Sequence, residues 1–170
     1  MGRITVLKNN CTQTYERFKT DVHSCCFNWN YFPGDDATPS HYQHVILSRP
    51  GFDGWLMPSQ QSEYLLHANE VLKEIFTLNE IEVDTILRIS VNSTYYIDGK
   101  CSPIHRDHDF NHQNILIYLS SFEGGNTHVY SAETRATHEP KEDDVIVFGG
   151  LHSMEQPKVG RRIVLVATYL

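Results

Sequence analysis

The sequence predicts a mainly β protein with flanking helices, an α+β fold in which short strands form a closed or sandwich architecture. The second half of the chain carries about eight short apolar runs separated by glycine, proline and aspartate turns, as in such architectures. The first half carries two segments whose apolar residues recur at helical spacing. We expect one domain over residues 1–170, with 1–80 as a helical and loop-rich support containing a candidate lid, and 81–170 as the β core.

The chain begins with a short apolar run over residues 3–7, which predicts a strand. Residues 10–22 carry apolar side chains at helical spacing, and Asn10 or Thr12 is a suitable N-cap. An aromatic-rich strand is predicted over residues 27–32, and the Pro-Gly-Asp-Asp sequence that follows it is typical of a turn.

Residues 33–61 are rich in proline and glycine and predict a long loop, interrupted by one strand over 42–47. Long irregular segments in compact domains are often functional, so this segment is the candidate lid. Its aromatic residues and those just before it either form a rim over a substrate or fasten the loop to the core. They are Tyr31, Phe32, Phe52 and Trp55.

Residues 59–76 predict a helix with a buried apolar stripe, and Ser59 is its candidate N-cap. Residues 83–97 predict a long strand that ends at the Asp98-Gly99 turn. One face of this strand is apolar, whereas the other is polar at every second position. A face so polar and so regular is expected to line a cavity. Its candidate pocket-lining residues are Asn92, Tyr96 and Arg88.

The remaining apolar runs predict the rest of the β architecture. They are short, and turn residues or polar segments separate them. The strands are expected over residues 114–120, 127–130, 145–148, 152–154 and 163–169.

A cluster of metal-ligating residue types lies between these strands. In an extended chain residues two apart point the same way, so His105 and Asp107 converge on one point. His152 follows an apolar run and supplies a third ligand. Two histidines and a carboxylate on one face of a metal, with the other face open, is the arrangement of non-haem Fe(II) oxygenases. Asp109, two residues from Asp107, stays an alternative ligand, and the nearby His108 and His112 open no second His-x-Asp pair.

Further motifs accompany these ligands, namely Ile117-Tyr118-Leu119, Gly124-Gly125-Asn126-Thr127 and Gly160-x-Arg162. Because these motifs and the three ligands follow one another in this order, residues 87–169 resemble the Fe(II)- and 2-oxoglutarate-dependent dioxygenases. The resemblance is closest to prolyl-4-hydroxylase-like members and to small oxygenases of this type encoded by marine phages. It implies a double-stranded β-helix, a cupin-like jelly roll, with the metal site in its open mouth.

The resemblance also implies a reaction and a role for each site residue. His105, Asp107 and His152 would hold Fe(II), which binds 2-oxoglutarate and O2, and the metal centre would be the whole of the catalytic machinery. Arg162 would hold the distal carboxylate of the oxoacid, since an arginine can bind a carboxylate through two parallel hydrogen bonds. Tyr118 would donate to the same group, with Thr127 in support.

In this family 2-oxoglutarate is decarboxylated to succinate and CO2 while an unactivated C–H is hydroxylated. The expected substrate is an amino acid or a side chain of a peptide or protein. Halogenases of the family replace the metal-binding carboxylate by a small residue, so Asp107 favours hydroxylation. Arg161 faces away from Arg162 on a strand and is expected to be solvated.

Two other functions use the same residues. A jelly-roll module could bind a metal or ligand without turnover, although such a module needs neither Tyr118 nor Arg162. Two histidines and a carboxylate can also hold zinc in a hydrolase. The sequence has no glutamate placed as general base as in H-E-x-x-H, which disfavours the hydrolase.

Composition and charge disfavour several classes of partner. The net charge of −7 argues against nucleic acid, which requires a basic face. No apolar run approaches the roughly 20 residues of a membrane span, and the residues from Met1 onward predict a strand and not a signal peptide. The four cysteines show no C-x-x-C spacing, so we expect reduced thiols and a cytoplasmic protein that acts on a small molecule, peptide or protein. The sequence carries no indication of oligomeric state.

Overall fold

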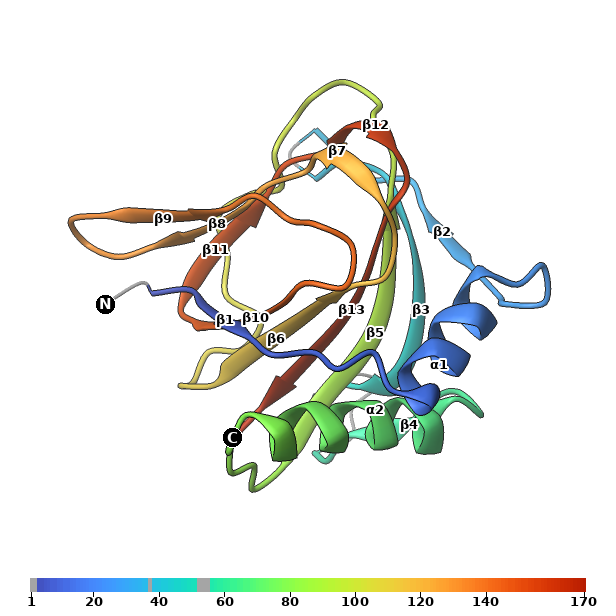
Figure 1. The fold of residues 1–170 in the computed structure, drawn as a ribbon. Coiled ribbons are helices and arrows are strands. Elements are labelled where there is room, and N and C mark those ends of the chain that lie inside the picture. The colour runs from blue at the N-terminus through green and yellow to red at the C-terminus, as the bar shows by residue number, and fades with distance from the viewer. Residues whose placement is uncertain (1–2, 37, 52–55) are drawn as a thin grey trace.

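A computed structural model describes residues 3–36, 38–51 and 56–170 (Figure 1). Two helices and thirteen strands lie in these ranges, mostly as antiparallel sheet, and the mainly β prediction is confirmed. In chain order they are β1 (Thr5–Leu7), α1 (Gln13–His23), β2 (Asn30–Phe32), β3 (His41–Ser48), β4 (Ser59–Gln60), α2 (Leu65–Leu78), β5 (Ile86–Thr94), β6 (Gln113–Tyr118), β7 (Phe122–Gly124), β8 (Thr127–Tyr130), β9 (Arg135–His138), β10 (Val145–Gly149), β11 (Leu151–Met154), β12 (Pro157–Gly160) and β13 (Arg162–Tyr169).

The strands form one large sheet and two small ones. The large sheet has the order β1-β10-β6-β13-β5-β3-β2, and β4 pairs with the C-terminal end of β3. One small sheet has the order β11-β8-β9, and β12 pairs with β7. Val129 of β8 packs against Leu116 of β6 and Val164 of β13, so the small sheet closes over the inner face of the large one. The result is the jelly roll that the sequence resemblance implied (Figure 1).

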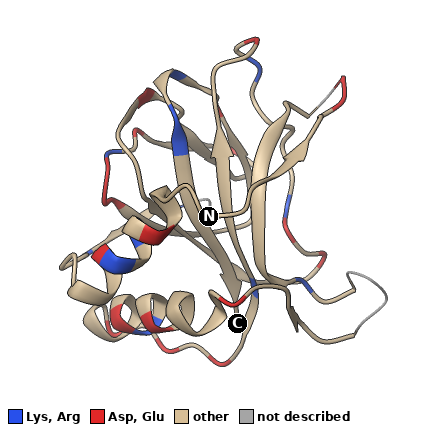
Figure 2. Cartoon of the chain, turned by 90° about the vertical axis from the view of Figure 1, so that its right-hand side faces the viewer, with Lys and Arg blue, Asp and Glu red and all other residues tan. Residues whose placement is uncertain are grey.

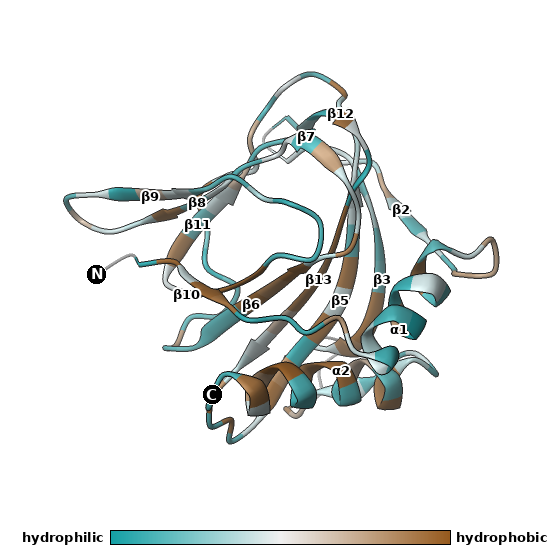
Figure 3. Cartoon of the chain, in the orientation of Figure 1, coloured by the Kyte–Doolittle hydropathy of each residue, from teal (hydrophilic) through white to brown (hydrophobic). Residues whose placement is uncertain are grey.

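Both helices cover the outer face of the large sheet. Tyr15 and Phe18 of α1 and Phe76 of α2 are buried in one core with Ile89 of β5 and Leu165 of β13. Apolar residues accordingly concentrate on these strands and on the sheet side of α2 (Figure 3). Because alternate residues of a strand face opposite sides, this packing turns the polar residues of β5 toward the inner cavity.

The charged residues lie mainly on the helices and loops in the view of Figure 2, with no continuous basic face. This distribution accords with the net charge of −7. Among the described residues, no helix combines the length and the apolar character needed to span a bilayer.

The helix predicted from Ser59 begins only at Leu65, with Tyr64 at the N-cap position. Ser59 is instead part of β4 and pairs with Ser48 of β3, and their hydroxyl oxygens are 2.8 Å apart. The backbone N–H of Gln61 also donates to Ile46. Pairing with the sheet thus overrides the local N-cap signal at Ser59.

Two predicted strands are shorter in the structure because neighbouring contacts end them. The strand expected over 27–32 is reduced to β2, since Phe27 leaves the sheet and is buried in the helix-side core. The strand expected over 83–97 is β5, which ends at Thr94. Beyond it the Gln156 side-chain oxygen accepts hydrogen bonds from successive backbone N–H groups, beginning with Ile97 at 2.7 Å.

Candidate metal centre

Three side chains predicted as metal ligands converge in the mouth of the jelly roll. The candidate ligand atoms of His105, Asp107 and His152 all lie within 4.8 Å of one another. Oδ2 of Asp107 is 3.5 Å from Nε2 of His152. A first-row metal ion with bonds of about 2.1 Å places adjacent ligands about 3.0 Å apart, so this spacing fits three ligands on one face of an ion.

Backbone hydrogen bonds fix the two histidines next to each other. His105 and His152 form an isolated antiparallel bridge. The backbone nitrogen of His105 lies 3.0 Å from the carbonyl oxygen of His152, and the nitrogen of His152 lies 2.9 Å from the carbonyl oxygen of His105. Each ring also donates from Nδ1 to the carbonyl two residues earlier, at 2.8 Å to Pro103 and 3.3 Å to Gly150. Since a carbonyl oxygen only accepts, Nδ1 carries the proton and Nε2 is left with its lone pair for a metal.

The charge states of the ligands also suit a metal. Burial alone would raise the pKa of Asp107, but Arg88 and then the neighbouring imidazoles outweigh it, so the pKa is lowered. Burial lowers the pKa of His152, which keeps its ring neutral. A metal requires an ionised carboxylate and a neutral imidazole, so both shifts favour binding.

The other histidines and the aspartate near the motif point elsewhere. Nε2 of His108 is 2.8 Å from the Thr168 hydroxyl, and Nδ1 of His112 donates to the Phe110 carbonyl at 2.8 Å. Asp109 is exposed. Within the described ranges, no second group of three such side chains converges.

Two histidines outside the metal group, one buried and one partly buried, make the stability of the metal-free protein depend on pH. Burial lowers the pKa of His108 and of His138. The unfolded chain, with a histidine pKa of about 6.5, therefore takes up protons before the folded protein does. We expect the free energy of unfolding to be highest above about pH 6.5 and to fall as the pH drops below it.

Urea unfolding in the presence of a chelator, at about pH 7.5 and about pH 5.5, measures this loss. The variant His138→Gln removes one of the two groups and should make the loss smaller. A free energy of unfolding that stays constant over this interval would contradict the expectation.

A second group of predicted residues lies at the other end of the same cavity. Arg162 is only 1% exposed, and its Nη2 donates to the Thr127 hydroxyl at 3.2 Å. The Tyr118 hydroxyl is 2.9 Å from the same Thr127 oxygen, and the guanidinium lies 5.3 Å from the centre of the Tyr118 ring. Burial lowers the pKa of Arg162, and no carboxylate of the described residues pairs with it. A buried cation without a counter-ion is costly, so an anionic ligand beside Arg162 would be strongly stabilised.

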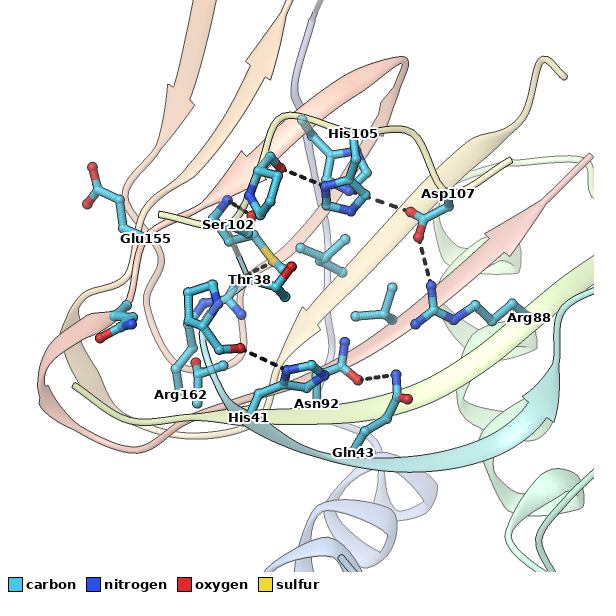
Figure 4. Close-up of a pocket in the computed structure, with 18 residues that line it drawn as sticks. Thr38, His41, Gln43, Arg88, Asn92, Ser102, His105, Asp107, Glu155 and Arg162 are labelled. Atoms are coloured by element: carbon cyan, nitrogen blue, oxygen red, sulfur yellow. Dashed lines mark hydrogen bonds and ion pairs between the residues drawn. The ribbon is translucent and has the colours of Figure 1, made fainter. Parts of the chain in front are cut away.

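A cavity of about 340 Å³ joins the two groups. Figure 4 shows His105 and Asp107 on one side of it and Arg162 on the other. Arg88 and Asn92 line it, and Nε2 of Gln43 donates to Oδ1 of Asn92 at 2.9 Å.

Tyr96, the third residue expected to line this cavity, does not do so and is 59% exposed. The alternation of faces that placed it there ends with β5 at Thr94. Tyr31 and Phe32 are also exposed, and Phe32 stacks on His41, a cavity-lining residue, with ring centroids 5.2 Å apart. Phe52 and Trp55 lie outside the described residues.

Arg161 and Arg162 point to opposite faces, but Arg161 is not simply solvated as expected. Its Nε donates to the Ser93 hydroxyl at 2.7 Å, and its guanidinium lies 4.5 Å from the Trp29 ring centre. Sequence reasoning also missed the contact between Arg88 and Asp107, because it joins strand and loop residues with no spacing rule to relate them.

Gly125 brings the backbone close to Arg162 in a conformation that suits glycine. Its φ is +66°, and an added Cβ would lie 2.9 Å from Cε2 of Phe122 and 3.1 Å from Cδ of Arg162. We expect Gly125→Ala to lower the free energy of unfolding by about 2 kcal/mol or more, from the left-handed backbone and the crowding together. Urea unfolding measures it.

Gly51→Ala is the matched control, since Gly51 has a φ of +83° and nothing within 4 Å of the added Cβ. It shares the backbone cost without the crowding. Equal losses of stability in the two variants would show that the crowding against Phe122 and Arg162 has no energetic consequence.

The sequence matches no family model and no curated protein at a significant level. Solved structures are similar to this chain. A 2OG-Fe(II) oxygenase family protein from Burkholderia pseudomallei has a TM-score of 0.72 at 17% identity, covering 98% of this chain and 84% of that one.

Two further solved structures are also similar to this chain. A prolyl hydroxylase from Trichoplax adhaerens, in complex with a hypoxia inducible factor peptide fragment, has a TM-score of 0.62 at 14% identity, covering 98% and 83%. A non-heme alpha ketoglutarate dependent carbocyclase from nogalamycin biosynthesis has a TM-score of 0.63 at 8% identity, covering 98% and 78%. The chain therefore has the jelly-roll fold of the 2OG-Fe(II) oxygenases, as its sequence motifs indicated.

Proposed function

We propose that this protein is an Fe(II)- and 2-oxoglutarate-dependent oxygenase. It hydroxylates an unactivated C–H of an amino acid or of a peptide or protein side chain, and O2 and 2-oxoglutarate are consumed as succinate and CO2 form. One observation carries the proposal: the unpaired, buried Arg162 faces a cavity that ends at His105, Asp107 and His152. A dicarboxylate that reaches from a metal to an arginine fits that arrangement.

The residues of the chain fit Fe(II) and the oxoacid. His105 and His152 would each offer Nε2 to the metal, and Asp107 would offer Oδ2. When bound, the iron and the oxoacid supply the O2-dependent oxidation. Arg162 would bind the distal carboxylate, and Tyr118 would donate its hydroxyl to the same group, while Thr127 fixes both side chains through its own hydroxyl.

The cavity wall also shields the reacting groups from water. Leu116 of β6 and Val166 of β13 pair across the large sheet, and both line the cavity. Charge interactions are stronger in such surroundings than in water, so an anion held by Arg162 gains more from the contact. Asn92 and Gln43 present amide groups that would orient a polar substrate.

The cavity and one structural neighbour support an amino acid, a peptide or a protein as the substrate. The prolyl hydroxylase of Trichoplax adhaerens was solved with a peptide, and the amide-lined wall beside Asn92 suits a peptide or an amino acid. The net charge of −7 argues against nucleic acid as the substrate. All four cysteines are free thiols, which supports a cytoplasmic site of action. We take residues 1–170 to be a single oxygenase domain.

The decisive experiment is to add 2-oxoglutarate to the anaerobic protein loaded with Fe(II) and to record the visible charge-transfer band of a chelated keto acid. We expect the band in the wild type, its loss in His152→Ala and its weakening in Arg162→Ala. Arg161→Ala is the control, because Arg161 lies on the opposite face and should leave the band intact. A protein that binds Fe(II) without forming the band would overturn the oxygenase and favour a binding module.

Zinc replacement separates the oxygenase from a zinc-dependent hydrolase. Glu155 is the one glutamate among the described residues that line the cavity, and it is already paired with Nε2 of His128 at 2.9 Å. A free general base beside the metal is thus not offered by the described part of the wall. Succinate release should require Fe(II) and stop with zinc, whereas a hydrolase would gain activity.

A further inference from the structure

The two oxygens of the Asp107 carboxylate have different partners. Nη1 of Arg88 donates to Oδ1 at 2.7 Å, whereas Oδ2 points to the metal site, 3.5 Å from Nε2 of His152. Arg88 donates the only hydrogen bond that Asp107 accepts from the described side chains and backbone. Figure 4 shows Arg88 below Asp107, with a dashed line from its guanidinium to the carboxylate.

Arg88 is held firmly in this place. It lies within β5, which is hydrogen-bonded on both sides, to β13 and to β3, and its Cα pairs with that of Thr168. Its side chain is only 17% exposed and that of Asp107 only 8% exposed, so little water competes for the contact. The same arginine is also the largest influence favouring ionisation of Asp107.

A carboxylate can bind a metal through one oxygen or through both. If Asp107 used both, it and the two histidines would occupy four of the six positions of an octahedral ion. A chelating oxoacid needs two adjacent positions and O2 needs one, which is three in all. The reaction therefore requires that one oxygen of Asp107 be kept off the metal.

We propose that Arg88 is a positioning residue that holds Oδ1 of Asp107 and so keeps this carboxylate bound to the metal through Oδ2 alone. The inference rests on the proposed function, in that the metal binds at His105, Asp107 and His152. It assigns to Arg88 the task of preserving three open positions. Arg88 touches neither the metal nor the oxoacid in this role, and it acts through Asp107.

The number of metal-bound waters tests this directly. Water-proton relaxation of the Mn(II)-loaded protein should report three exchanging waters in the wild type and about two in Arg88→Met. Arg88→Lys keeps a charged donor and should restore three. Arg161→Met, which removes an arginine outside the cavity, should also keep three. If Arg88→Met folds poorly, Arg88→Gln, whose amide is too short to reach Asp107, replaces it.

Binding constants add a second readout. In Arg88→Met we expect Mn(II) to bind at least as tightly as in the wild type. The two positions left open suffice for 2-oxoglutarate, so the complex of this variant with Mn(II) and the oxoacid should keep no exchanging water, whereas the wild-type complex should keep one. A merely structural role would weaken both ligands together and leave three waters on the metal, which overturns the proposal. If the wild type has three metal-bound waters but does not bind 2-oxoglutarate, the oxygenase proposal is refuted. The effect of replacing Arg88 on the water count would still decide whether Arg88 positions Asp107. A wild type that binds no Mn(II) would refute both.

Discussion

Replacing Arg162 by methionine is expected to stabilise the ligand-free protein and to abolish its response to 2-oxoglutarate. The guanidinium is buried, and no carboxylate of the described part of the chain pairs with it. It donates to the neutral groups of Gly125, Thr127 and Met154. Replacing buried ionic groups with apolar ones often adds about 1–4 kcal/mol to the free energy of unfolding. Methionine fills much of the same space and needs no counter-ion.

Urea unfolding with and without 2-oxoglutarate, in the presence of Mn(II), measures both effects. At about 100 times its dissociation constant, the oxoacid should add about 2.7 kcal/mol to the wild type. It should add almost nothing to Arg162→Met. Arg161→Met is the control: it loses the contacts with Ser93 and Trp29, so it should be slightly less stable and keep the response. A ligand-free Arg162→Met that is less stable than the wild type would show that the arginine is not under electrostatic stress.

Asp107→Ala is expected to remove metal binding and also to destabilise the metal-free protein. The metal loses its one anionic ligand, so its affinity should fall far below that of the wild type. Arg88 is left largely buried without its counter-charge. Breaking a buried ion pair from one side costs about 3 kcal/mol or more.

The double variant Asp107→Ala/Arg88→Met separates these two effects. It removes the stranded charge together with its partner, so it should regain most of the lost stability and none of the metal affinity. Calorimetric titration with Mn(II) and urea unfolding of all three variants give the measurement. Stability losses that simply add would mean that the two side chains do not interact.

The sequence predicts the parts of this site that depend on short-range periodicity. Alternation along an extended segment brings His105 and Asp107 together, although they lie in the loop between β5 and β6, and alternation also separates Arg162 from Arg161. The same rule places Arg88 and Asn92 on the cavity side of β5. It fails at Tyr96, because the strand has already ended where Gln156 binds the backbone.

What the sequence does not predict are contacts between segments far apart in the chain. The salt bridge from Arg88 to Asp107 depends on where a loop lies over β5, and no spacing encodes that. Ser59 has the residue type of an N-cap, yet it pairs with β3, because tertiary pairing outweighs a cap of about 1 kcal/mol. Propensity therefore identifies the elements, while the register of the sheets decides their ends.

The backbone bridge between His105 and His152 attaches the segment 102–105 to the edge strand β11. Ser102 extends this attachment, because its N–H donates to the Met154 carbonyl and its hydroxyl oxygen accepts from the Met154 N–H. A metal bound to both histidines would link this segment to β11 and close the long stretch of chain between the two residues, as a cross-link does. Opening of this segment and escape of the ion would then be a single event. Protease cleavage near Ser102 and the dissociation rate of the metal should share one rate-limiting step.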